Sequence, residues 1–320
     1  MRSERAKHLE QVEIIEGREL MQTKGQMFRG CTVALVTPFR DGSVDEAALR
    51  NLVDWHMEQG TPVISPVGTT GESPTLSHLE HERVISLVVE QAAGRAKVLA
   101  GTGSNATSEA VRLTRFAERA GADGALLVAP YYNRPSQEGL YAHYSRIAEE
   151  TDLPLMLYNV PGRTARNIEP ETVERLARIA RVVAIKEASG SLDQVSELRS
   201  RTELTILSGD DSLTLPMLAV GAEGVVSVVA NLVPRDVMAL IEAFEQGDLQ
   251  AARQRHLALF PLCRDLLSIA ANPIPVKTAM ALLGRDSGEL RLPLCPPDDR
   301  GREALLQSLI RHGLLPGTAR

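Results

Sequence analysis

The chain has 320 residues and a formal net charge of −6 at pH 7, with a sequence pI near 5.7. This acidic balance, together with the lack of any long basic run, argues against nucleic acid as a main partner. The three cysteines, Cys31, Cys263 and Cys295, are widely spaced and form no CxxC pair, so the sequence predicts neither a disulfide framework nor a zinc site and favours a reducing, cytoplasmic location.

The first 27 residues mix Arg, Glu, Lys and Gln and contain no apolar core of the kind that signal peptides carry. No later stretch reaches roughly 18 uninterrupted apolar residues, so the sequence predicts no association with a membrane. We predict a poorly ordered amino-terminal extension over residues 1–27, with translation from Met27 as an open alternative.

From residue 28 to residue 247, short β-rich runs alternate with longer stretches whose apolar residues have helical spacing. The predicted strands are Cys31–Phe39, Pro62–Gly68, Ala96–Gly103, Gly124–Pro130, Leu153–Pro161, Val182–Ser189, Leu204–Asp211 and Gly224–Asn231. The predicted helices are Asp45–Gln59, Leu76–Ala93, Thr107–Ala120, Ser136–Thr151, Glu169–Ala180, Leu192–Arg201, Ser212–Val220 and Pro234–Gln246.

Strand–helix alternation eight times over indicates parallel crossovers and a closed (β/α)₈ TIM barrel over residues 28–247. A doubly wound open sheet is the alternative, but it usually carries a glycine-rich phosphate loop after its first strand, and none follows Pro38. Residues 248–320 carry helical patterns alone and predict a C-terminal helical region that covers a barrel flank or builds an oligomer contact. Its predicted helices are Leu249–Ala270, Pro275–Leu283 and Arg302–Leu315.

Lys186 follows the apolar, β-branched run that begins at Val182. Such a run predicts a strand buried on both faces, and lysine is rarely buried without a partner or a task. In an apolar pocket the charged ammonium is disfavoured, so a free amine becomes available to attack a carbonyl carbon. A salt bridge that caps the strand is the alternative. The chain as a whole favours the amine, because no other lysine ends a predicted strand.

The reactive groups of a TIM barrel gather at the carboxyl ends of its strands. Hydroxyls and glycines dominate these ends, and no His, Asp and Glu cluster with metal-ligand spacing occurs there, which argues against a metal-dependent aldolase. Thr69 and Thr70 lie in a glycine-flanked turn that offers backbone N–H groups and hydroxyls to a small carboxylate. Arg163 either grips a second carboxylate with its forked donors or is an ordinary surface arginine.

All five tyrosines lie in the fourth and fifth strand–helix units. Tyr131, Tyr132 and Tyr158 occupy strand ends beside the strand of Lys186, where a phenol passes protons to and from a carbinolamine or imine. We interpret the other two as packing residues of a helix. These residues together predict a pocket in which a 2-oxo acid becomes an imine on Lys186, beside a seat for another carboxylate-bearing molecule.

Five motifs follow one another along the chain: Gly68-Thr69-Thr70-Gly71-Glu72-Ser73, Tyr158-Asn159-Val160-Pro161-Gly162-Arg163-Thr164, Ile185-Lys186-Glu187-Ala188, Ser208-Gly209-Asp210-Asp211 and Asn272-Pro273-Ile274-Pro275-Val276-Lys277. In this order they resemble the pyruvate-dependent class I aldolases, and within them the dihydrodipicolinate synthase family. The likeness extends from Phe28 to Leu315. It implies an enzyme, a lyase that condenses pyruvate with L-aspartate 4-semialdehyde to give 4-hydroxy-tetrahydrodipicolinate in diaminopimelate and lysine biosynthesis.

The resemblance also implies roles for individual residues. Lys186 forms the Schiff base with pyruvate, and the proton relay consists of Tyr158, Thr69 and Tyr132. In this family Tyr132 reaches into the site of a neighbouring subunit, and the expected assembly is a homotetramer built as a dimer of dimers. No metal or organic cofactor is implied, because the covalent imine on Lys186 carries the chemistry.

For substrate binding, the resemblance assigns Thr70 to the pyruvate carboxylate, with Gly209 and Val226 lining that pocket through their backbones. It assigns Arg163 to the carboxylate of L-aspartate 4-semialdehyde. Sialic-acid lyases and sugar-acid members of the family generally lack an arginine in this place. A threonine, Thr69, rather than a serine precedes Thr70, and this also favours the dihydrodipicolinate synthase family over those members.

Relatives that are inhibited by L-lysine bind it at the tight dimer interface, and the resemblance implies modest feedback inhibition here. Glu109 and Asn105 would hold the ammonium and the carboxylate of the inhibitor. Pro74 stands where alanine is common, which removes one backbone N–H and stiffens the loop. The matching positions are Ser73, Pro74, His78, His81, Asn105, Glu109 and Tyr131. Without the resemblance, the two histidines are simply exposed residues of an amphipathic helix.

Two other functions remain open from the sequence. One is another pyruvate-dependent aldolase or lyase, of the sialic-acid lyase or 2-oxo-sugar-acid type, which shares Lys186 and Tyr158 but has no need of Arg163. The other is a non-enzymatic, small-molecule-binding regulatory barrel, which would tolerate the change Lys186→Arg.

Overall fold

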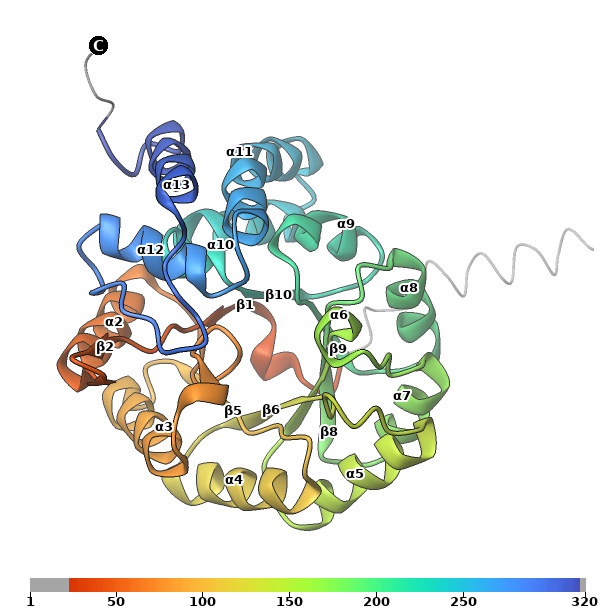
Figure 1. Cartoon of the computed structure of the whole chain (residues 1–320). Helices are drawn as coiled ribbons and strands as arrows, with labels where there is room; N and C mark the ends of the chain where they lie inside the picture. The colour runs from red at the N-terminus through yellow and green to blue at the C-terminus, as the bar shows by residue number, and fades with distance from the viewer. Residues whose placement is uncertain (1–22, 317–320) are drawn as a thin grey trace, which may run out of the picture.

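The computed structural model describes residues 23–316, and its central feature is a closed barrel of eight parallel strands (Figure 1). Around the barrel the strands follow the order β1-β10-β9-β8-β7-β6-β5-β4, with β4 paired to β1. The prediction of a TIM barrel is therefore confirmed, and the open doubly wound sheet is excluded. The bounds are β1 Gly30–Ala34, β4 Val63–Ser65, β5 Lys97–Gly101, β6 Gly124–Val128, β7 Leu155–Asn159, β8 Val182–Glu187, β9 Thr205–Ser208 and β10 Gly224–Ser227.

A ring of helices covers the outside of the barrel, as Figure 1 shows. Their starts agree with the sequence: the side chain of Asp45 accepts a hydrogen bond from the Ala48 N–H at the first helix, and Ser77 and Glu80 form a capping box at the second. The helices of the ring are α2 Glu46–Gln59, α3 His78–Ala92, α4 Thr107–Ala120, α5 Gln137–Glu149, α7 Pro170–Ala177, α8 Leu192–Arg201, α9 Thr214–Ala219 and α10 Pro234–Glu245.

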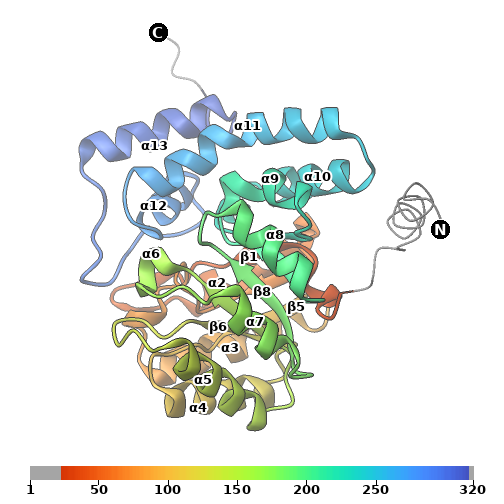
Figure 2. The ribbon, with the colours of Figure 1, turned by 90° about the vertical axis from the view of Figure 1, so that its right-hand side faces the viewer.

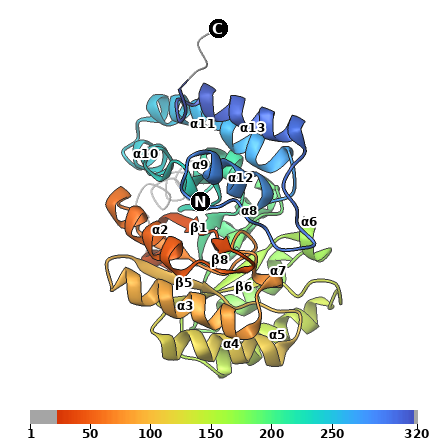
Figure 3. The same cartoon turned by 60° about the vertical axis from the view of Figure 1, so that its left-hand side comes forward.

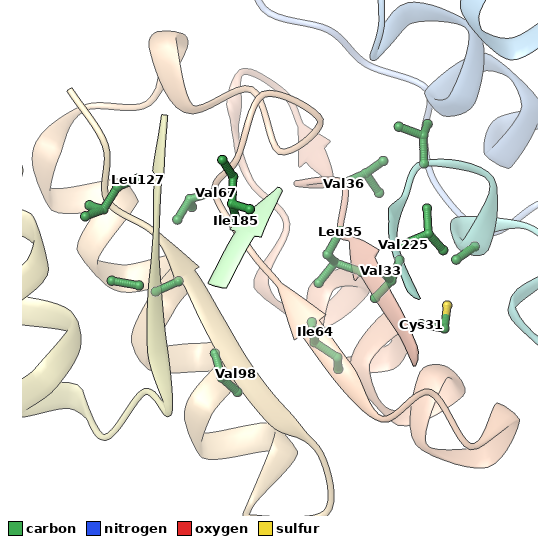
Figure 4. Packing of buried hydrophobic residues seen from close by; sticks show 14 of the residues in the cluster. Cys31, Val33, Leu35, Val36, Ile64, Val67, Val98, Leu127, Ile185 and Val225 are labelled. Atoms are coloured by element: carbon green, nitrogen blue, oxygen red, sulfur yellow. The ribbon is translucent and has the colours of Figure 1, made fainter. Parts of the chain in front are cut away.

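Two buried clusters divide the side chains of the strands. In the outer cluster the strands pack against the helices, and Ile185 and Leu157 belong to it (Figure 4). The inner cluster fills the barrel and contains Ala184, Met156 and Tyr158. Because side chains alternate along a strand, Lys186 must lie on the same face as Ala184, which is the inside of the barrel.

The amino-terminal end of the barrel is closed by a short 3₁₀ helix, η1 Gln26–Phe28. The ring of Phe28 is fully buried in the inner cluster, and a Cβ on Gly124 would lie 2.5 Å from it, so glycine makes room for this ring. Just before η1, Thr23 is buried and donates a hydrogen bond to Glu223. Residues 23–27 of the predicted extension thus pack against the barrel, whereas residues 1–22 lie outside the described part.

The predicted strands are longer than the observed ones, and three kinds of short element were missed. Within the predicted strand Cys31–Phe39, the observed strand β1 ends at Ala34. The residues that follow are buried but do not pair in the sheet, and their apolar character made the predicted strand too long. The missed elements are the hairpin β2 Phe39–Arg40 with β3 Ser43–Val44, the short helix α6 Pro161–Thr164, and the 3₁₀ helices η2 Ser73–Thr75, η3 Asp211–Leu213 and η4 Val229–Asn231, in addition to η1.

Three appended helices follow the barrel: α11 Leu249–Ser268, α12 Ile274–Leu282 and α13 Asp299–Arg311. Figures 2 and 3 show α11 and α13 as an outer layer, with α12 between this layer and the barrel. The first seven residues of α12 are all buried, so this helix packs as part of the core. Within residues 23–316, none of the helices has the length and apolar character needed to cross a membrane.

Candidate active site

Lys186 and Tyr158 lie directly opposite each other on the neighbouring strands β8 and β7. Since both side chains point into the barrel, the Nζ of Lys186 lies 4.1 Å from the centroid of the Tyr158 ring. The lysine side chain is nearly buried, with 6% of the residue exposed. Among the described residues it makes no ion pair, which leaves the amine free of the strand-capping salt bridge that the sequence left open.

Gly209 provides the space that the Lys186 side chain needs. A Cβ at residue 209 would lie 3.1 Å from the Cε of Lys186 and 2.5 Å from the Cβ of Ala188. Real Cβ atoms essentially never approach another atom as closely as the second of these distances, so a side chain at residue 209 would collide with Ala188 and press on Lys186. The predicted role of Gly209 in lining the pyruvate pocket stays a prediction.

Two carboxyl groups, of Asp210 and Asp211, follow the neighbouring strand β9 and feel the charge of Lys186. Burial raises the pKa of the Asp210 carboxyl, and the positive charge of Lys186 acts in the opposite direction. Burial also raises the pKa of Asp211, whose carboxylate accepts hydrogen bonds from the Ser227 hydroxyl and from the N–H groups of Val228 and Val229. Asp211 therefore clamps the end of β10, the strand that carries Val226 on its inner face.

The turn after β4 holds Thr69 and Thr70 at the carboxyl end of the barrel. It is closed by hydrogen bonds from the Gly71 N–H to the Gly68 carbonyl and from the Glu72 N–H to the Thr69 carbonyl, each 3.1 Å long. Thr70 is buried, and its Oγ1 accepts a hydrogen bond of 3.0 Å from the Nδ2 of Asn272. The loop between α11 and α12, which carries Asn272, thus contacts the turn that carries Thr70.

Arg163 lies on α6, at the rim of the same mouth. Its side chain is exposed, and one guanidinium nitrogen donates a hydrogen bond of 3.2 Å to the backbone carbonyl of Asn272. The remaining donors of the guanidinium are available to an anion in the mouth of the barrel. This placement agrees with the predicted reach of Arg163 over the barrel.

A cavity of about 370 Å³ opens at the carboxyl ends of strands β4 to β7. It brings the predicted catalytic and regulatory positions into one space, because both sets contribute to its walls. The predicted residues that line it are Thr69, Tyr158, Arg163, Ser73, Pro74, His78, His81, Glu109 and Tyr131. Lys186, Thr70, Gly209 and Val226 are not among the lining residues, but Tyr158 lines the cavity and its ring lies against the amine of Lys186.

Polar contacts organise the regulatory side of the cavity. The Nε2 of His78 lies 2.5 Å from a carboxylate oxygen of Glu109, and Ser104 donates a hydrogen bond to the other oxygen. The Ser104 hydrogen bond, followed by that of His78, lowers the pKa of Glu109 against the effect of burial. Asn105 does not line the cavity, but its Nδ2 donates to the carbonyl of Tyr131. His81 is buried rather than exposed.

Tyr132 is the predicted catalytic residue that a single chain does not bring to the site. Its residue surface is 92% exposed, and it is absent from the walls of the cavity. Its backbone has a φ of 73°, the left-handed region that non-glycine residues rarely adopt. In the single chain the Tyr132 side chain is thus exposed on a sparsely populated backbone conformation, and its role stays a prediction.

Sequence reasoning missed a buried polar network behind Lys186. The carboxylate of Glu187 is buried and accepts hydrogen bonds from Asn159 (3.0 and 3.1 Å), Gln194 (2.9 Å) and the Ser189 N–H (2.7 Å). Burial raises the pKa of Glu187, and these hydrogen bonds oppose the increase. The signal was present in the motif after Lys186, where a second charged residue follows in an apolar run.

No group of three or more His, Cys, Asp or Glu side chains within residues 23–316 is arranged to hold a metal ion. The cavity wall carries phenols, hydroxyls, a guanidinium, two imidazoles and the carboxylate of Glu109, and the amine of Lys186 lies against the ring of Tyr158, which lines the cavity. An amine and a phenol in contact suit imine chemistry on a carbonyl compound, and the hydroxyls and the guanidinium suit the binding of carboxylates.

Comparison with known proteins gives a consistent result. Residues 27–312 match the Dihydrodipicolinate synthetase family. The 4-hydroxy-tetrahydrodipicolinate synthase of Pelobacter propionicus is 55% identical over 291 residues, which cover 90% of this chain and 100% of that protein. The crystal structure of dihydrodipicolinate synthase from Aquifex aeolicus has a TM-score of 0.89 and 49% identity, and the match covers 91% of this chain and 100% of that one.

A third similar protein is the DHDPS of Cyanidioschyzon merolae, whose structure was solved with lysine bound. Its TM-score is 0.88 at 41% identity, and the match covers 90% of this chain and 99% of that chain. The family match spans most of the chain, and the Pelobacter relative is aligned over its whole length. The chain therefore belongs to the dihydrodipicolinate synthetase family.

Proposed function

We propose that this chain condenses pyruvate with L-aspartate 4-semialdehyde through an imine on Lys186, and so makes 4-hydroxy-tetrahydrodipicolinate for diaminopimelate and lysine biosynthesis. Family membership and the activity for which the relatives are named support this reaction. The observation that carries the assignment is the nearly buried amine of Lys186 beside the phenol of Tyr158, inside the barrel and next to the cavity.

The reaction begins when the neutral amine of Lys186 adds to C2 of pyruvate and water is lost. Loss of a proton from C3 of the imine gives an enamine, and C3 then attacks the aldehyde carbon of the second substrate. The amino group of that substrate adds to the imine carbon, which closes the ring and releases Lys186. Because the imine itself withdraws electrons from C3, this sequence needs neither a metal nor an organic cofactor.

Tyr158, with Thr69 and Tyr132 as the further members of a relay, moves protons during imine formation and release. The contact between the Tyr158 ring and the Lys186 amine supports the first of these roles, and the position of Thr69 on the cavity wall supports the second. Tyr132 is exposed in its own chain, so it would serve the site of a neighbouring subunit. The proposed assembly is a homotetramer made of two such dimers.

Thr70 is assigned to the carboxylate of pyruvate, with the backbones of Gly209 and Val226 as the other walls of that pocket. Support comes from the burial of Thr70 and from the close approach of residue 209 to the amine. Arg163 is assigned to the carboxylate of L-aspartate 4-semialdehyde, because it lines the cavity from the rim. The two carboxylates are thereby separated, one deep and one near the entrance.

L-Lysine is the proposed feedback inhibitor, and it would bind on the regulatory side of the cavity. The cluster of His78, Glu109 and Tyr131 supports this proposal, as does the lysine-bound structure of the Cyanidioschyzon relative. Activity assays with millimolar L-lysine test it directly. Unchanged activity would contradict the proposal, and inhibition that disappears in the variant Glu109→Ala would support it.

Borohydride trapping tests the central step. The protein is reduced in the presence of pyruvate, digested, and the peptide that holds Lys186 is examined by mass spectrometry for the reduced adduct. Absence of the adduct from Lys186 would exclude the imine mechanism and favour a non-enzymatic binding barrel, and the variant Lys186→Arg is the control. Turnover of sugar-derived aldehydes in preference to L-aspartate 4-semialdehyde would instead identify another aldolase of the same mechanism.

A further inference from the structure

Asn272 joins the two substrate-binding groups although it lies outside the barrel, in the loop between α11 and α12. Its Nδ2 donates to the Oγ1 of Thr70 at 3.0 Å, and its backbone carbonyl accepts from Arg163 at 3.2 Å. Its Oδ1 is buried and has no hydrogen-bond partner among residues 23–316. In that part of the chain, the hydrogen bond to Thr70 is therefore what holds the orientation of the amide.

The direction of this hydrogen bond matters for anion binding. A threonine hydroxyl has one proton to donate and two acceptor lone pairs. When an amide N–H occupies a lone pair of Thr70, the hydroxyl proton stays available and is directed away from Asn272. A carboxylate can only accept hydrogen bonds, so it requires the proton of Thr70 to point toward it. Because Thr70 is buried, bulk water does not set this orientation.

We propose that Asn272 is a positioning residue for pyruvate, whose amide orients the Thr70 hydroxyl so that it donates to the substrate carboxylate. The inference rests on the proposed function, in which Thr70 binds that carboxylate. A nearby buried ion pair, between the Nζ of Lys277 and the Oε1 of Glu72 at 2.7 Å, holds the loop of Asn272 against the turn of Thr70. The segment that carries the amide is thus anchored to the turn of Thr70 by the residues that follow it.

The test compares four proteins with the wild type: Asn272→Ala, Thr70→Val, the double variant, and Thr278→Val. For each, the pyruvate concentration that gives half-maximal borohydride trapping is measured together with kcat and KM for pyruvate. Loss of one hydrogen bond to a charged group predicts that Asn272→Ala raises KM for pyruvate by about tenfold, with little change in kcat at saturating pyruvate. Thr278→Val, which removes a bond from Thr278 to Ile274 on the same helix, leaves KM unchanged.

The double variant distinguishes positioning from an independent contribution. If Asn272 acts through the Thr70 hydroxyl, Asn272→Ala adds nothing to the KM of Thr70→Val. Effects that multiply, or an unchanged KM in Asn272→Ala, would overturn the inference while leaving the proposed function intact. An unchanged KM in Thr70→Val would instead remove the assignment of Thr70 on which both depend. Asn272→Leu, of similar size and without a donor, repeats the test if the alanine variant does not fold.

Discussion

The ammonium nitrogen of Lys277 lies 2.7 Å from a carboxylate oxygen of Glu72, and both side chains are completely excluded from solvent. The same ammonium donates to the carbonyl of Thr37 at 2.9 Å and lies 4.2 Å from the centroid of the Phe39 ring. The second oxygen of Glu72 accepts from the N–H of Arg291. The appended helices are in this way connected to the turn that follows β4.

Replacing Lys277 by Met should destabilise the protein by about 3–5 kcal/mol, because it leaves the carboxylate of Glu72 buried without its partner. Chemical denaturation measures the change in the free energy of unfolding. The double variant Lys277→Met, Glu72→Gln removes both charges and should recover most of the loss. Equal instability of the single and the double variant would show that the ion pair is not the source of the effect.

Tyr158→Phe should lower kcat by about 10²–10⁴-fold, because it keeps the ring that packs against Lys186 and removes only the hydroxyl that we propose as a proton carrier. Steady-state kinetics measure this change, and unfolding curves should be close to those of the wild type. Tyr144→Phe is the matched control, since that phenol is buried in the outer cluster, away from the amine. Full activity in Tyr158→Phe would remove this residue from the relay.

Arg163→Ala should raise KM for L-aspartate 4-semialdehyde by at least about tenfold, through loss of a charge-assisted hydrogen bond. Trapping of pyruvate on Lys186 should be nearly unaffected, because Arg163 is assigned to the aldehyde and not to pyruvate. The two assays are run on the same preparation. Equal loss in both would mean that the arginine supports the architecture of the mouth rather than the second substrate.

Gly209→Ala should strongly reduce imine formation on Lys186 and should lower the thermal stability of the protein only slightly. The new Cβ would meet the Cε of Lys186 at 3.1 Å and the Cβ of Ala188 at 2.5 Å, so the amine or its strand must shift. Borohydride trapping measures the first effect and thermal unfolding the second. Gly162→Ala is the control, since a Cβ there meets nothing within 4 Å. Normal trapping in Gly209→Ala would show that the lysine side chain adapts.

Stability should decrease as the pH falls from about 6.5 to about 4, in part because of His81 and His143. Burial lowers the pKa of both imidazoles from 6.5 to about 4, so in this window the unfolded chain binds protons that the folded protein does not. Each histidine contributes a loss of at most roughly 3 kcal/mol. Unfolding of His143→Gln at pH 7 and pH 4.5 should show a smaller difference than the wild type; an equal difference would contradict this account.

The barrel could be predicted because its signals are local. Each strand–helix unit repeats an apolar run followed by helical spacing, and the position of Lys186 at a strand end follows from that repeat. Strand bounds were less accurate, since Leu35 and Val36 are as buried as strand residues without pairing in the ladder. The hairpin after β1 was missed for a related reason, because Phe39 is a core residue at the end of an apolar stretch.

The supports of the site were not predictable in the same way. Glu72 and Lys277 are 205 residues apart, and only the folded chain shows that a lysine of an appended helix pairs with a carboxylate of the first units. The hydrogen bond from Asn272 to Thr70 spans a similar separation of 202 residues. Sequence motifs indicate which residues contact the substrate. The residues that position them through hydrogen bonds and ion pairs come from distant elements, and their contacts depend on how the chain packs.

The position of the Phe28 ring bears on how the substrates enter the barrel. This ring fills the amino-terminal end of the barrel, and the cavity of about 370 Å³ opens at the opposite end, where the strands finish. Lys186 is nearly buried inside the barrel, whereas Arg163 is exposed at its rim, so a molecule held by Arg163 would lie nearer to solvent than one bound to the amine. With Arg163 assigned to the aldehyde, we therefore expect the keto acid to bind first.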